Sequence, residues 1–449
     1  MYMKLGKKFV GVFASAVIAT SMLAGCGVNP TTKKTEDEAD SGSKDKKVEI
    51  TFWNYPNFEV IDNKAGKYEE QIVAAFNEKY PDIKVNVEMI SFNGGPEKIN
   101  AAIASKTQPD VVFDFPGRII EYGRQGVLAP LDDMLKDNDK TDIPEIILNA
   151  SSLGGTLYMY PFNTTPNLMA FNKTMLEELG LLDMLPLNNP DRSWTVDDYT
   201  KLLKAIKEKA PKDVTPVVFY SKTNQGDQAT RALVSNLYGG KTISDDSSEY
   251  LLNSSEAVKG MEWVQKGIKD GIILKGGEAM ISGDAIDMYL QGKAASTIIY
   301  SPVLKKTSEA KKTTPFDDVY VPFPAPEKPQ LEAFIGGFGV FDKGDSAKVE
   351  ASKKFVDFIA NDPEWGKKNV LSTGAFSVRS SITNLYDDEE SKYAEHMIQY
   401  LGTYYNAVPG FAEMRTFWFP ALQNITLGNA KPKDALDDFV KKSNELLNQ

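Results

Sequence analysis

The chain has 449 residues, a formal net charge of −11, one cysteine and one histidine. Its length allows two or three domains with hydrophobic cores, and its acidic excess disfavours nucleic acid as a partner, since nucleic-acid binding depends on many Lys and Arg contacts to phosphate. The single histidine excludes a two-histidine zinc site and the single cysteine excludes a disulfide within the chain; we predict no metal and no cofactor.

The first 26 residues have the pattern of an export signal. Lys4, Lys7 and Lys8 form a basic start, residues 9–22 form an apolar run too short to span a membrane comfortably, and the run closes on LAGC, which ends at Cys26. This leader resembles a bacterial lipoprotein signal peptide. The resemblance implies that residues 1–25 are removed, that Cys26 is acylated and that two or more acyl chains anchor the protein to the outer face of the cell membrane. An ordinary secretory leader that contains a cysteine is the alternative.

Residues 26–47 comprise the lipidated cysteine and a segment rich in Thr, Ser, Gly, Lys, Asp and Glu, with very little to bury. This composition predicts a flexible tether whose ends lie on the order of 25 Å apart.

From residue 48 onward the chain alternates between strand and helix patterns. Apolar residues at every second position predict strands at 48–52 and 83–87, a helical period predicts a helix at 68–79, and a short apolar run predicts a third strand at 109–113. This rhythm is typical of a parallel sheet covered by helices, in which ligands bind beyond the carboxyl ends of the strands. The loops at 53–56 and 114–118 are therefore the first places to look for a site.

The second half repeats the α/β character. Thr195, followed three residues later by Asp198, predicts a capped helix start, with Trp194 placed to pack on Tyr199. Strands are predicted at 214–220 and at the end of 289–300, with further helices around 257–268, 346–360, 395–404 and 433–447. The sequence thus predicts an α/β fold with two lobes.

Six segments together resemble the extracellular solute-binding proteins of bacterial ABC importers, in the carbohydrate-binding family that includes maltose-binding protein (solute-binding protein family 1). The resemblance is carried by their order along the chain, and the segments are 105–126, 160–173, 193–194, 289–295, 334–341 and 431–447.

This resemblance implies two discontinuous α/β lobes with a ligand cleft between them. The N-lobe would comprise residues 48–162 and 327–375, and the C-lobe residues 163–326 and 376–449. A hinge motion would close the cleft on a carbohydrate, and the liganded protein, a monomer and not an enzyme, would deliver it to an ABC permease served by a cytoplasmic ATPase.

The candidate ligand-binding residues supply aromatic faces and fixed polar groups, which are the two ways of holding a sugar. An Arg offers a rigid fork to neighbouring hydroxyls or a carboxylate, and an Asp accepts from hydroxyls. Trp53 and Tyr55 fit either cleft or core, and Asn163 and Thr165 fit either hinge or ligand contact. The full set is Trp53, Tyr55, Asp114, Phe115, Arg118, Asn163, Thr165, Tyr300, Gly337 and Trp418.

Three other functions stay open at this point. A surface glycoside hydrolase needs only two suitably spaced carboxylates, and 62 acidic residues leave that possible. A non-catalytic adhesin would bind no small ligand in a saturable way. A binding protein for a non-sugar solute would keep the fold and change the site.

Overall fold

The computed structural model describes residues 47–91, 94–136, 138–223 and 225–448, which belong to one compact unit of the chain. The predicted leader, Cys26 and the tether up to residue 46 lie outside the described residues. In the described part, no helix is long and apolar enough to cross a membrane, and no three His, Cys, Asp or Glu side chains are grouped as metal ligands.

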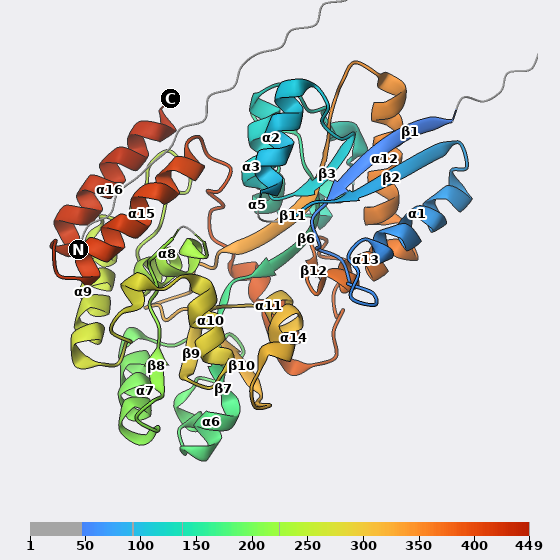
Figure 1. Cartoon of the computed structure of the whole chain (residues 1–449). Coiled ribbons are helices and arrows are strands. Elements are labelled where there is room, and N and C mark those ends of the chain that lie inside the picture. The colour runs from blue at the N-terminus through green and yellow to red at the C-terminus, as the bar shows by residue number, and fades with distance from the viewer. Residues whose placement is uncertain (1–46, 92–93, 137, 224, 449) are drawn as a thin grey trace, which may run out of the picture. The chain divides into compact units, whose positions relative to one another are not determined.

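The first lobe is built on a six-stranded sheet with the order β12-β6-β11-β3-β1-β2 (Figure 1). The pairs β1–β2 and β1–β3 are parallel, as predicted, and the three pairs β3–β11, β11–β6 and β6–β12 are antiparallel. The strands are β1 Val48–Asn54, β2 Ile83–Met89, β3 Val111–Asp114, β6 Tyr160–Pro166, β11 Ala333–Val340 and β12 Phe376–Ser377.

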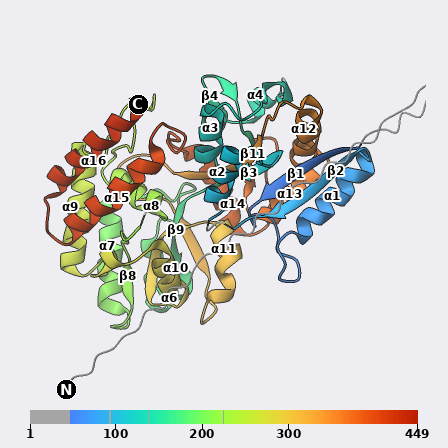
Figure 2. The same cartoon turned by 45° about the horizontal axis from the view of Figure 1, so that its top comes forward.

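Helices cover both faces of this sheet because successive strand residues point to opposite sides. On one face Ile50 and Phe52 pack with Phe76 of α1 and Phe355 of α12; on the other, Val112 packs with residues of α2, α3 and α5. Figures 1 and 2 show α1 and α12 on one side of the sheet and α2 and α3 on the other. The helices of this lobe are α1 Lys67–Lys79, α2 Gly95–Ser105, α3 Pro116–Arg124, α4 Asp139–Asp142, α5 Glu145–Ala150, α12 Ser346–Asn361 and α13 Trp365–Thr373, with a hairpin of β4 Ser152–Leu153 and β5 Thr156–Leu157.

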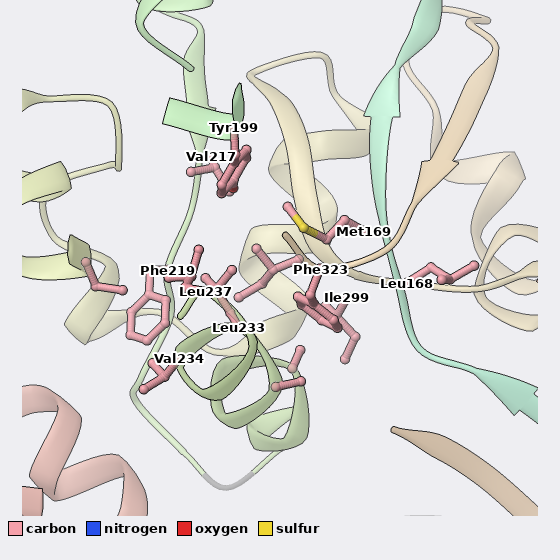
Figure 3. Close-up of a cluster of buried hydrophobic side chains, with 14 of the residues drawn as sticks. Leu168, Met169, Tyr199, Val217, Phe219, Leu233, Val234, Leu237, Ile299 and Phe323 are labelled. Carbon is pink, nitrogen blue, oxygen red and sulfur yellow. The ribbon is translucent and has the colours of Figure 1, made fainter. Parts of the chain in front are cut away.

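The second lobe is built on a four-stranded sheet with the order β10-β7-β9-β8. Side chains from its strands and from surrounding helices form one apolar core, part of which Figure 3 shows. The strands are β7 Leu168–Asn172, β8 Thr215–Val217, β9 Ala294–Tyr300 and β10 Asp318–Val321. The helices are α6 Lys173–Glu178, α7 Val196–Lys209, α8 Asp227–Asn236, α9 Ser255–Asp270, α10 Ser282–Leu290, α11 Pro302–Ser308, α14 Glu389–His396, α15 Phe411–Thr426 and α16 Pro432–Leu447.

The predicted start of α7 is confirmed. The Thr195 hydroxyl accepts from the Asp198 amide, and the Asp198 carboxylate accepts from the Thr195 amide, which forms a capping box. The ring centroids of Trp194 and Tyr199 lie 5.1 Å apart, so the two side chains pack as predicted.

The two lobes are discontinuous, as predicted, but their boundaries differ from those the resemblance implies. The boundary between residues 162 and 163 falls inside β6, because β6 pairs with β11 as far as Pro166. The later boundary between 375 and 376 falls before β12, whose Phe376 and Ser377 still pair with β6. Residues 163–166 and 376–377 therefore belong to the first lobe.

Helices α8 and α15 are among the helices that the sequence does not predict. Helix α8 begins after Gly226, and α15 contains Pro420 in its interior. A proline inside a helix removes one hydrogen bond and usually ends the helix, so the sequence around Pro420 does not predict a helix. Both helices contribute to the cleft described next.

Candidate ligand-binding cleft

A cavity of about 720 Å³ lies between the two lobes. The first lobe lines it with α2, α3 and the start of β11, and the second lobe with α8, the start of α15 and the loop before α15. This volume lies within the range of about 300–1,000 Å³ that is typical of small-molecule binding sites.

The first-lobe wall contains an ion pair of one arginine and one aspartate. Strand β3 ends at Asp114, which is fully buried, and α3 then places Arg118 one turn along, where Arg118 Nε donates to Asp114 Oδ2 at 2.7 Å. A second guanidinium N–H donates to Asp114 Oδ1, and so does the Phe115 amide. Behind the pair, the Tyr55 hydroxyl lies 3.5 Å from Asp114 Oδ2, and burial raises the pKa of Tyr55, which stays neutral.

Aromatic rings line both sides of the cavity. Phe115 and Phe334 of the first lobe have ring centroids 6.3 Å apart, and the Arg118 guanidinium lies 5.6 Å from the centre of the Phe115 ring. Tyr404 and Phe411 line the cavity near the second lobe. These rings are half-buried and therefore have faces available to a ligand.

The second-lobe wall contains two arginines around one carboxylate. Arg231 Nη1 donates to Asp227 Oδ2 at 2.5 Å within α8, and Arg415 of α15 donates through Nε and Nη2 to the same carboxylate at 2.9–3.1 Å. Burial opposes ionisation of Asp227, yet the two guanidiniums hold its pKa below the ordinary value. Asp227 is therefore ionised at neutral pH.

The network continues toward the segment that joins the two sheets. Arg231 Nε donates to the Tyr405 hydroxyl at 2.7 Å, and this hydroxyl donates to the Glu332 carboxylate, one residue before β11. Withdrawal of the carboxylate from water raises the pKa of Glu332 to about 7, although Arg231 and Tyr405 favour its ionised form.

Of the predicted site residues, the structure brings four together at the first-lobe wall. Phe115 and Arg118 line the cavity, and Asp114 and Tyr55 lie directly behind them. Trp53 packs in the core of the first lobe, with the Lys98 ammonium 4.6 Å from its ring centre.

Three predicted residues lie in the strands of the first sheet instead of on the cavity wall. Asn163 and Thr165 are buried in β6, where Asn163 Nδ2 donates to Thr373 Oγ1 at 3.1 Å. Gly337 lies in β11, where a Cβ atom would stand 2.4 Å from the Tyr160 carbonyl oxygen. Close packing of two strands explains this glycine.

The structure contradicts the predicted cleft positions of Trp418 and Tyr300. The Trp418 ring is 0 % exposed in the core of the second lobe, and its indole N–H donates to Thr230 Oγ1 of α8 at 2.8 Å. Tyr300 is also 0 % exposed and packs on Tyr289 and Tyr320. Both are core residues, because the helix α15 and the end of β9 turn their rings inward.

Sequence reasoning missed the charged residues of the second-lobe wall. Asp227 and Arg231 have the i, i+4 spacing of a helical ion pair, which was the one available signal. Nothing local connects Asp227 to its second partner Arg415, 188 residues further along. The missed cavity-lining residues are Asp227, Arg231, Phe334, Tyr404, Phe411 and Arg415.

Many solved structures have the same fold as this chain. Among solved structures, the Listeria monocytogenes ABC substrate-binding protein Lmo0181, in complex with cycloalternan, is similar to this chain with a TM-score of 0.70 and 20 % identity, over 90 % of this chain and 99 % of that chain. The cyclic alpha-maltosyl-1,6-maltose binding protein from Arthrobacter globiformis matches at a TM-score of 0.72 and 18 % identity, over 89 % and 99 % of the two chains. These likenesses confirm the predicted fold.

Sequence relatives cover nearly the whole chain. The galactooligosaccharide-binding protein of Bacillus subtilis is 25 % identical over 98 % of this chain and 97 % of its own, and the arabinooligosaccharide-binding protein of the same organism is 24 % identical over 85 % and 82 %. The family model for bacterial extracellular solute-binding proteins matches residues 62–364. The chain therefore belongs to the bacterial extracellular solute-binding protein family.

Proposed function

We propose that the chain is the substrate-binding subunit of an ABC importer and that it captures a carbohydrate, an oligosaccharide, in the cleft between its lobes. The observation that supports this most directly is the lining of the cavity. Phe115 and Phe334 offer ring faces for the C–H faces of sugars, and Arg118 and Arg415 offer fixed donors for hydroxyls. The oligosaccharide-binding relatives support the same substrate class.

Capture and release follow from a hinge between the lobes. Three connections join the lobes: at Asn167 after β6, between β10 and β11, and after β12. Rotation about these short segments changes the width of the cleft without disturbing either core. The closed, liganded form would then present a surface to the permease. No catalytic step is part of this proposal.

The proposal includes a lipid anchor at Cys26 and a monomeric protein. Acylation of Cys26 would anchor the protein to the outer face of the cell membrane, and the tether would hold a monomer near its permease. Metabolic labelling with a radioactive or clickable fatty acid tests this directly: native protein takes up the label and Cys26→Ser does not. Labelling that persists in Cys26→Ser would overturn the assignment of the anchor.

The proposed ligand class can be tested by thermal shift. The full chain carrying Cys26→Ser, which cannot be acylated at that position, is screened against neutral and acidic oligosaccharides. A ligand that binds only the folded state must raise the melting temperature by mass action. We expect a shift with one saccharide class, reduced in Phe334→Ala and kept in Phe417→Ala, because Phe417 is half-buried on α15 away from the cavity.

Two outcomes would contradict the proposal. The absence of any shift across a broad panel would favour a non-sugar solute or an adhesin. Catalytic release of reducing ends from a bound glycan would favour a glycoside hydrolase.

A further inference from the structure

The second-lobe wall holds two positive charges around one negative charge. Asp227 Oδ2 accepts from Arg231 and from Arg415, and Asp227 Oδ1 accepts from Arg415 Nη2 at 2.9 Å. Both carboxylate oxygens are therefore already used by the two guanidiniums. By contrast, Arg118 and Asp114 on the opposite wall form a one-to-one ion pair.

Within the described part of the chain, Arg231 also keeps one hydrogen-bond donor, Nη2, without an acceptor. Its side chain is 0 % exposed, and its Nη1 and Nε donate to Asp227 and to the Tyr405 hydroxyl. Its Nη2 is buried and has no hydrogen-bond partner among the described residues, and Arg231 contributes to the cavity lining. A buried N–H without an acceptor is costly, and native proteins generally fill such a place with water or a ligand.

The neighbouring acids do not restore the balance of charge. Glu332 makes its hydrogen bond to the Tyr405 hydroxyl and not to Arg231 itself, and its pKa of about 7 leaves it only partly ionised at physiological pH. Glu97, Glu121 and Glu413 line the same cavity, but their side chains are exposed. Water and salt screen exposed charges effectively.

We infer, building on the proposed function, that the saccharide captured in this cleft is acidic and that Arg231 and Arg415 bind its oxyanion. The oxyanion is the carboxylate of a uronic acid or a sulfate ester on the sugar. Arg231 Nη2 donates to it, and Arg415 supplies the second positive charge. Closure of the cleft removes water, which strengthens charge-assisted hydrogen bonds and makes an unbalanced charge more costly. A neutral sugar would leave this excess charge without a counterion.

The test is a set of calorimetric titrations of the full chain carrying Cys26→Ser. Oligogalacturonides and glucuronate-containing oligosaccharides are each compared with their own carboxyl-reduced counterparts, and a sulfated galacto-oligosaccharide is compared with the unsulfated sugar. We expect at least one acidic member to bind about tenfold more tightly than its neutral counterpart, as a charge-assisted hydrogen bond would provide. The arm that shows this preference identifies the oxyanion as carboxylate or sulfate.

Variants connect the preference to the two arginines. Arg415→Gln removes one charge at a half-buried position and is expected to weaken binding of the acidic sugar about tenfold more than binding of the neutral sugar, which abolishes the preference. Arg124→Gln is the matched control, because Arg124 also lines the cavity but pairs with Glu121 and with the Ala407 carbonyl. Circular dichroism and melting temperature confirm that each variant is folded.

The possible contrary results separate this inference from the proposed function. Binding of neutral sugars with equal or greater affinity in every pair would overturn the inference and leave the proposed function standing. A preference that persists in Arg415→Gln and in Arg231→Lys would overturn the assignment to these arginines. Absence of binding by any saccharide would overturn both.

Discussion

The two walls of the cleft differ in how their charges are compensated. On the first-lobe wall, Asp114 and Arg118 form a one-to-one pair, and the Arg118 side chain is 36 % exposed. On the second-lobe wall, Arg231 and Arg415 share Asp227, and Arg231 is 0 % exposed. The first wall therefore provides aromatic faces beside a one-to-one ion pair, whereas on the second wall two guanidiniums share one carboxylate. We therefore expect the first lobe to recognise the shape of the ligand and the second lobe to recognise its charge.

This comparison depends on how the second wall is held together, which Trp418→Ala tests. Trp418 of α15 contacts Thr230 of α8, so it fixes the helix that carries Arg415 against the helix that carries Asp227. Removing a fully buried Trp leaves a large cavity, and we expect a loss of about 3–5 kcal/mol in the free energy of unfolding. Urea denaturation measures this. Trp418→Phe is the milder control, and an unchanged stability in Trp418→Ala would contradict the buried position.

Removing the carboxylate from each wall compares the two directly. Asp227→Ala leaves Arg231 charged and buried, so we expect a destabilisation of about 3–5 kcal/mol. Asp114→Ala leaves Arg118 in contact with water and loses mainly hydrogen bonds, so we expect about 1–2 kcal/mol. Both are measured by urea denaturation at the same pH. Equal losses would show that the walls do not differ in the way described.

The pH dependence of stability tests Glu332, which lies behind the second wall. Its pKa is about 7 in the folded chain against an ordinary value of 4.5. The folded state therefore favours the protonated acid, and the resulting stabilisation is complete below about pH 4.5 and lost as the pH rises through about 7. Relative to the native chain, Glu332→Gln is expected to gain about 2 kcal/mol between those limits.

The check on Glu332 is a pair of urea denaturation series at about pH 5 and about pH 8. Glu413→Gln, at an exposed position on the same cavity, is the control. A stability difference between native and Glu332→Gln chains that stays constant with pH would exclude the raised pKa.

The smallest expected effect concerns the aromatic side of the first wall. Phe115→Ala and Phe334→Ala should each weaken saccharide binding by about 1 kcal/mol, or roughly fivefold, through loss of a ring face. Because both rings are half-buried, folding should be little affected. Calorimetric titration with the best saccharide of the panel measures the effect. If Phe417→Ala weakens binding equally, the rings of the cavity have no special role.

The sequence predicts the first wall and misses the second for a physical reason. Alternating strand and helix patterns from residue 48 to 126 place the loop at 114–118 beyond the end of β3, and in the structure Phe115 and Arg118 line the cavity. Helix α8 begins after a glycine in a left-handed conformation and α15 continues through Pro420, so neither start nor continuation gives a helical signal. The pairing of Asp227 with Arg415 depends on tertiary packing, which no local pattern contains.

For aromatic residues, too, the sequence does not reveal the tertiary packing that decides between core and cavity. A Trp with aromatic neighbours, such as Trp418 between Phe417 and Phe419, fits a binding surface and a core equally well in sequence terms. Only the packing of α15 on α8 and α16 decides that this ring is buried, with the Phe439 ring 5.0 Å from it. Phe334 has no such neighbours, yet its position just inside β11 puts it on the cavity.

A crystal structure of the chain with the tightest-binding saccharide of the panel tests the central claim most directly. We predict that the sugar lies in the cleft, with a ring against Phe115 or Phe334 and an oxyanion within hydrogen-bonding distance of Arg231 Nη2. A saccharide bound outside this cleft would contradict the account. So would a saccharide in the cleft that leaves Arg231 Nη2 without an acceptor, because the charge imbalance of the second wall would then have no part in recognition.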